Sequence, residues 1–211
     1  MREAVREPFF DAEHQRSSVA LGMWVFLAQE VLFFGVLFAL YATLRIRYPE
    51  VFLTYGPRLD WGLATAMTAV LLLSSFTMAL AVRFAFLRRR GPLLLTIAST
   101  AILGLVFLAM KAWEYVHHLE QGETPSVDLF SRSGEAGMET FFGIYFVMTG
   151  FHALHVIGGI VVLAGLFVLA ARRRPEELRG TPTMGVGLYW HFVDVVWLFL
   201  FPALYLVGLS S

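Results

Sequence analysis

The chain contains no cysteine and few charged residues. Without cysteine it has no disulfide framework, no thiolate nucleophile and no metal centre held by cysteine. Its 16 basic and 16 acidic residues balance to a formal net charge of zero, which argues against a nucleic-acid partner. Hydrophobic residues make up 58% of the 211 residues, with 20 Phe, and this is too apolar for a soluble domain of this size. The composition therefore indicates an integral membrane protein.

The sequence has five apolar segments that are each long enough to cross a membrane. About 20 residues of helix span the roughly 30 Å of hydrocarbon at about 1.5 Å per residue. We expect helices at about 18–46, 60–87, 92–119, 138–171 and 185–209. The connections are short and no internal repeat is visible, so we predict an all-α fold in which residues 1–211 form a single bundle of five transmembrane helices.

Arginine is distributed unevenly between the two sides of this predicted bundle. Eleven arginines lie in the amino-terminal segment and in the second and fourth connections, whereas four lie on the other side. The positive-inside rule then predicts a cytoplasmic amino terminus and a carboxyl terminus outside. Two basic clusters on the cytoplasmic side are candidates for binding anionic lipid headgroups. They comprise Arg88, Arg89, Arg90, Arg172, Arg173 and Arg174.

Seven polar or charged side chains fall inside the apolar segments. They are Glu30, Lys111, Glu114, His152, His155, His191 and Asp194. A charge at a helix centre costs roughly 3 kcal/mol or more in a bilayer, so we expect these groups to face the bundle interior and to have partners. His191 and Asp194 are one turn apart, which predicts a hydrogen-bonded pair. Lys111 and Glu114 are three residues apart, which predicts an ion pair.

The depth of each residue in its helix predicts a further contact. Glu30, His155 and Asp194 lie within about 5 Å of the membrane midplane. We therefore predict that Glu30 is protonated or hydrogen-bonded inside the bundle, with His155 as its partner. His152 and Gly159 share one face of the fourth helix, which we expect to point inward.

The same polar groups do not suggest catalysis in this chain. Haem ligation needs imidazoles at matching depth, but His191 is expected about 9 Å from the centre of its helix, unlike His155. No serine, histidine and acid arrangement and no phosphate-binding loop stands out. We predict no haem, metal or catalytic residue here and a role for the polar groups in packing. Tyr189 and Trp190 are expected at the inner membrane interface, in an aromatic belt.

Four segments resemble subunit III of the haem-copper respiratory oxidases. They are Leu21–Gly35, Lys111–Tyr115, Thr149–Gly159 and Trp190–Leu200. Each combines rare intramembrane polar residues with aromatic neighbours, and the segments recur in the family order over nearly the whole chain. Glu30 matches the carbodiimide-reactive acid of that family. The chain has five helices where the long form has seven, so it resembles the short bacterial form, whose missing pair another subunit could supply.

This resemblance implies a non-catalytic core subunit of cytochrome c oxidase in a bacterial inner membrane. Subunit III of the family packs directly against subunit I, which holds the haems and copper, in a complex with subunit II and in some cases a small subunit IV. It carries no redox cofactor, supports proton uptake and binds phospholipid. The alternatives are subunit III of a quinol oxidase and the related accessory protein of nitric oxide reductases. A proton-coupled transporter is a more distant alternative, because intramembrane acids and histidines also form proton relays.

Overall fold

The computed structural model describes residues 12–123, 136–172 and 181–206. Five long helices are α1 (Ala12–Arg47), α3 (Trp61–Phe86), α4 (Arg90–Glu120), α5 (Ala136–Arg172) and α6 (Thr181–Tyr205). Each is long and apolar enough to cross a membrane, which confirms the prediction of five transmembrane helices. Their bounds lie within six residues of those predicted, and the largest difference is that α1 begins six residues earlier, whereas α6 begins and ends four residues earlier.

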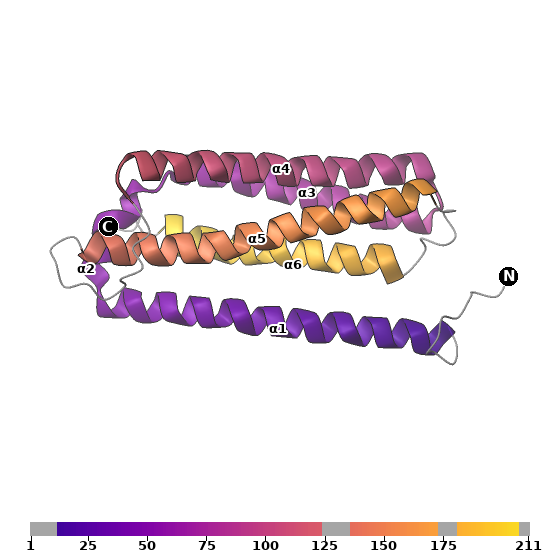
Figure 1. Cartoon of the computed structure of the whole chain (residues 1–211), viewed down its shortest axis with the longest axis horizontal. Coiled ribbons are helices and arrows are strands. Elements are labelled where there is room, and N and C mark those ends of the chain that lie inside the picture. The colour runs from indigo at the N-terminus through magenta and orange to yellow at the C-terminus, as the bar shows by residue number, and fades with distance from the viewer. Residues whose placement is uncertain (1–11, 124–135, 173–180, 207–211) are drawn as a thin grey trace.

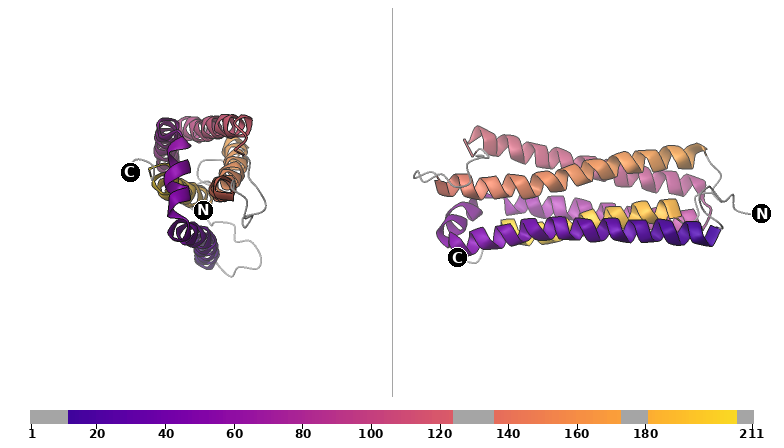
Figure 2. Two further views of the ribbon diagram at one scale, coloured as in Figure 1. Left: turned by 90° about the vertical axis from the view of Figure 1, so that its left-hand side faces the viewer. Right: turned by 60° about the horizontal axis from the view of Figure 1, so that its bottom comes forward.

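Helices α3, α4, α5 and α6 form a four-helix bundle, and α1 lies beside it. Seen end-on, the four helices occupy the corners of a square and α1 stands outside one corner (Figure 2). In the side view α1 runs along the lower edge of the bundle, next to α5 and α6 (Figure 1). Helix α3 packs on α4 and α6, α5 packs on the same two helices, and α1 contacts chiefly α6.

The buried residues of α3 recur at alternating steps of three and four. They are Ala64, Met67, Leu71, Ser74, Met78, Ala81 and Ala85. This seven-residue repeat is the pattern of helices that coil around one another at small crossing angles. Because α3 buries a single stripe of residues, its remaining faces are left for lipid or for partner subunits.

Trp190 lies in the core of the four-helix bundle, so the prediction that it lies at the membrane interface is wrong. Its side chain is buried rather than placed in an aromatic belt, and its indole N–H donates to Ser74 Oγ at 2.9 Å. A Cβ atom at Gly104 or at Gly159 would come within 2.8 Å of the Trp190 ring. These two glycines therefore let α4 and α5 approach α6 closely.

Two short helices that were not predicted cover the end of the bundle where α1 ends. They are α2 (Pro49–Tyr55) and the 3₁₀-helix η1 (Gly56–Arg58). Phe52 of α2 is buried, with its ring 5.4 Å from that of Tyr41 and 5.5 Å from that of Phe141. The Tyr41 hydroxyl donates to the carbonyl of Ala203, which ties α1 to α6 at this end.

Candidate functional site: polar clusters inside the membrane spans

Lys111 and Glu114 form the predicted ion pair, and the pair is sealed inside the four-helix bundle. Lys111 Nζ lies 2.8 Å from Glu114 Oε2, and both side chains are almost fully buried. Lys111 also donates to the hydroxyls of Tyr145 at 3.0 Å and Tyr205 at 2.8 Å. All three ammonium donors are thereby used. Tyr205 in turn donates to Glu114 Oε1 at 2.9 Å, so the carboxylate binds a cation and a hydroxyl.

Aromatic rings surround the Lys111 ammonium. Its nitrogen lies between 4.6 and 5.5 Å from the ring centroids of Tyr115, Tyr145, Trp197 and Tyr205. Ring faces attract a cation, and the attraction is stronger where water is excluded. The cluster therefore compensates a buried charge in three ways, through the carboxylate, the hydroxyls and the rings.

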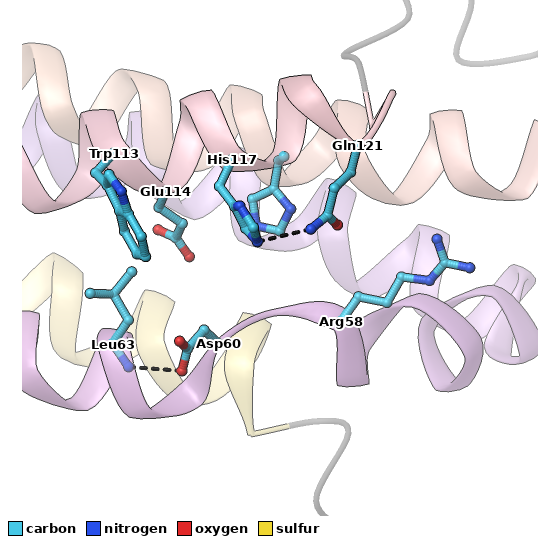
Figure 3. Close-up of a pocket in the computed structure, with 8 residues that line it drawn as sticks. Arg58, Asp60, Leu63, Trp113, Glu114, His117 and Gln121 are labelled. Carbon is cyan, nitrogen blue, oxygen red and sulfur yellow. Dashed lines mark hydrogen bonds between the residues drawn. The ribbon is translucent and has the colours of Figure 1, made fainter.

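A small pocket lined mostly by polar residues lies beside this cluster, at the end of the bundle where α4 ends. It has a volume of about 100 Å³, and Glu114 lines it together with Trp113 and His117 of the same helix (Figure 3). The remaining lining residues are Arg58, Asp60, Leu63, His118 and Gln121. The Trp113 and His117 rings are stacked 5.9 Å apart.

Two further groups of polar contacts involve residues that line or adjoin this pocket. His118 Nδ1 lies 2.6 Å from one oxygen of Glu123, whose other oxygen accepts a hydrogen bond from Arg58 at 3.1 Å. At the start of α3, the N–H of Leu63 donates to Asp60 Oδ1 at 2.9 Å (Figure 3). Asp60 therefore caps this helix.

Glu30 contacts His155 across the seam between α1 and α5, as depth in the membrane predicted. Glu30 Oε2 lies 2.9 Å from His155 Nε2, and the side chains are 12% and 18% exposed. His155 Nδ1 lies 2.7 Å from the carbonyl oxygen of Phe151, and the Tyr189 hydroxyl donates to the His155 carbonyl at 2.9 Å. The Phe34 ring packs edge-on against the imidazole at 5.1 Å.

These contacts fix how many protons the Glu30 and His155 pair holds. A carbonyl oxygen can only accept, so the proton on Nδ1 of His155 is donated to Phe151. Nε2 and the Glu30 carboxyl then have one proton between them, either as a carboxylic acid donating to imidazole or as an ion pair. Nε2 and the carboxyl thus share one proton at a partly exposed position on the edge of the bundle.

The predicted hydrogen bond between His191 and Asp194 is wrong, because His191 bonds to Ser75 of α3 instead. His191 Nδ1 is 2.7 Å from Ser75 Oγ, whereas neither carboxylate oxygen of Asp194 has a hydrogen-bond partner among the described residues. Asp194 lies one turn from His191 on α6, but no hydrogen bond joins its carboxyl to Ser75. Residues one turn apart share a face, but a neighbouring helix can still supply the better partner.

His152 is the most completely buried of the predicted polar residues. It faces inward, as predicted, and its ring packs 5.6 Å from that of Phe107 and 5.2 Å from that of Trp197. Neither ring nitrogen has a hydrogen-bond partner in the described part of the chain. His152 and Asp194 therefore differ from the other polar groups, whose hydrogen bonds are made within the bundle.

Comparison with known families identifies the chain. Residues 1–209 match the family model described as cytochrome c oxidase subunit III. The chain belongs to this family. Relatives named "Probable quinol oxidase subunit 3" cover 93% of the chain and 92% of their own length, and they come from Staphylococcus epidermidis at 31% identity and from Staphylococcus haemolyticus and Staphylococcus aureus at 30%. The predicted resemblance is thereby confirmed.

Membership of the subunit III family implies association with other oxidase subunits in a membrane. Within that family, the structure brings the predicted residues together in three places: the Lys111 and Glu114 cluster, the Glu30 and His155 pair, and the group around Ser75. Of the basic clusters, Arg88, Arg89, Arg90 and Arg172 are described and lie at the end of the bundle where α1 begins (Figure 1), whereas Arg173 and Arg174 are outside the described residues.

Proposed function

We propose that the chain is the non-catalytic subunit III of a quinol-oxidising haem-copper oxidase in a bacterial plasma membrane. Relatives that match it along almost their whole length carry the name of a quinol oxidase subunit, and this observation supports the proposal most directly. The sequence alone favoured cytochrome c as the donor and kept quinol as the alternative. The relatives favour that alternative, although the family as a whole is described by cytochrome c oxidase.

In this proposal the haems and copper belong to partner subunits. Among the residues that the structure describes, no three His, Asp or Glu side chains are arranged to hold a metal ion. The chain would pack directly against subunit I, in a complex with subunit II and, as in some complexes of the family, a small subunit IV. Its own polar clusters would then stabilise the complex and support proton uptake, rather than transfer electrons.

The donor can be tested on the purified complex. We expect the oxidase that contains this chain to consume oxygen when supplied with a short-chain quinol and to remain inactive with reduced cytochrome c. The same preparation should contain a subunit II without a copper centre. Oxygen consumption with reduced cytochrome c, together with copper in subunit II, would contradict the quinol assignment and leave the family membership intact.

We further propose that the basic end of the bundle is cytoplasmic and binds anionic lipid. Each arginine near an anionic surface contributes on the order of 1 kcal/mol. Because the chain has no cysteine, Arg89→Cys gives a single labelling site, which we expect to react from the cytoplasmic side only. Alanine at Arg88, Arg89, Arg90, Arg172, Arg173 and Arg174 should reduce co-purifying anionic lipid, and an unchanged lipid content would argue against binding there.

A further inference from the structure

Asp194 and His152 are buried inside the bundle, yet they lack hydrogen-bond partners. Their residues are 4% and 0% exposed, and both carboxylate oxygens and both ring nitrogens are without a partner among the described residues. Buried polar groups nearly always bind protein groups or ordered water. Two such groups in one bundle therefore indicate a polar site that the protein alone does not complete.

Both groups face the same part of the interior. Trp190, Asp194 and Trp197 are all buried on α6, and Asp194 lies one turn from each tryptophan. The His152 ring packs against that of Trp197 at 5.2 Å. Asp194 thus lies between two aromatic layers, and His152 belongs to one of them.

Ser75 and His191 connect this interior with the bundle surface. The Ser75 hydroxyl is 2.7 Å from His191 Nδ1, and His191 lies one turn from Asp194 on the same helix. When Ser75 donates this hydrogen bond, the neutral imidazole carries its proton on Nε2. His191 also lines a groove between α3 and α6, so the imidazole borders both the interior and the surface.

The groove leads from His191 toward the basic end of the bundle. It has a volume of about 260 Å³ and is lined by Ala79, Val82, Met184, Gly187, Leu188 and His191. Met184 and His191 are seven residues apart, which is about 10 Å along a helix, and Val82 lies one turn before the end of α3. The groove is apolar except at its inner end, where His191 is the one titratable group in its lining.

We propose that Asp194 and His152 line a hydrated site that exchanges protons with water in this groove through Ser75 and His191. Bound water completes the hydrogen bonds of the two buried side chains. The carboxyl of Asp194 is a neutral acid, because no basic group pairs with it among the described residues and an isolated charge in the membrane is too costly.

Each step of the proposed relay conserves the number of protons. Asp194 gives its proton to a bound water, which passes one of its own to Ser75 Oγ. Ser75 gives its hydroxyl proton to His191 Nδ1, and His191 releases the Nε2 proton to water in the groove. Every intermediate group breaks one bond to hydrogen and forms one, so the net result is the transfer of a single proton.

Infrared spectroscopy of the assembled oxidase tests this proposal. The carbonyl band of protonated Asp194 is identified by its loss in Asp194→Asn, and its shift in D₂O reports exchange. We expect the wild-type band to shift soon after transfer to D₂O. His191→Phe and Ser75→Ala should each slow the exchange by about tenfold or more, because either change interrupts the relay. His117→Phe, in the pocket at the other end of the bundle, is the matched control and should leave the rate unchanged.

Three results would overturn the proposal. The first is a wild-type band that does not shift after hours in D₂O, which would mean that lipid or a partner helix fills the groove and the interior is dry. The second is the absence of any carbonyl band that depends on Asp194. The third is exchange in Ser75→Ala and His191→Phe at the wild-type rate. If His191→Phe does not assemble, the wild-type and Ser75→Ala measurements still decide the question.

Discussion

Two acid and base pairs in this bundle have similar chemistry and different surroundings. Lys111 and Glu114 lie within the square of four helices, where two tyrosine hydroxyls complete their hydrogen bonds. Glu30 and His155 lie on the seam to α1, which stands outside the square, and their side chains remain 12% and 18% exposed (Figure 2). The comparison indicates that the first pair holds the bundle together, whereas the second joins α1 to a bundle that is already complete.

The largest effect should follow from breaking the sealed pair. Glu114→Ala leaves the Lys111 ammonium buried without its carboxylate, and removing one member of a buried ion pair costs about 3–5 kcal/mol. We expect strongly reduced assembly and a lower unfolding midpoint of the complex. The matched control is the double variant Lys111→Met with Glu114→Leu, which removes both charges and should recover much of the loss. Equal losses in the single and double variants would mean that packing volume, rather than the unpaired charge, is decisive.

A smaller effect is expected where the helices of the square approach most closely. A Cβ atom at Gly159 would lie 2.8 to 2.9 Å from ring carbons of Trp190, whereas one at Gly165 meets nothing within 4 Å. Overpacking of this kind costs about 1–3 kcal/mol. Gly159→Ala should therefore be less stable than Gly165→Ala by about that amount in thermal unfolding of the complex. Similar stability of the two variants would show that Trp190 can shift without cost.

The sequence predicted contacts best where local spacing or depth determines them. Lys111 and Glu114 are three residues apart on one helix, so their pairing needs no knowledge of the other helices. The contact between Glu30 and His155 joins two helices, but matching depth and the high cost of unpaired groups left few candidates. The five-helix architecture was predictable for the same reason, because the bilayer determines the length of each span.

Contacts made by small hydroxyls and by neutral rings were not predictable from the sequence. Ser75 lies in a segment without charge, and a serine hardly changes the hydropathy of a membrane helix, so its bond to His191 was missed. Trp190 was assigned to the membrane interface because tryptophan is frequent there, but two glycines on neighbouring helices make room for it in the core. The signal for α2 was Pro49, which stands at the first turn of that helix.

Variants of the α1 seam should affect assembly less than those of the sealed pair. Glu30→Ala leaves His155 Nε2 without its partner, and an unsatisfied buried group costs about 1–3 kcal/mol, with the lower end expected at this partly exposed site. Glu30→Gln keeps a donor for the imidazole and should retain oxygen consumption and the proton-to-electron ratio. Loss of proton pumping in Glu30→Gln, with normal assembly, would show instead that the proton shared by Glu30 and His155 is part of a relay.

The smallest effect should come from Tyr189→Phe, which removes only the hydrogen bond to the His155 carbonyl. A single neutral hydrogen bond contributes about 0.5–1.5 kcal/mol, and the variant retains the aromatic contact with Phe26, whose ring lies 5.8 Å away. If α1 is joined to a bundle that is already complete, Tyr189→Phe combined with Glu30→Ala should weaken α1 docking by more than either change alone, without lowering the unfolding midpoint of α3 to α6. Protease access to the connection between α1 and α3, measured alongside thermal unfolding, separates these two responses. If protease access increases and the unfolding midpoint of α3 to α6 also falls, the α1 interface and the four-helix bundle fold as one cooperative unit. The two acid and base pairs would then stabilise the same structure.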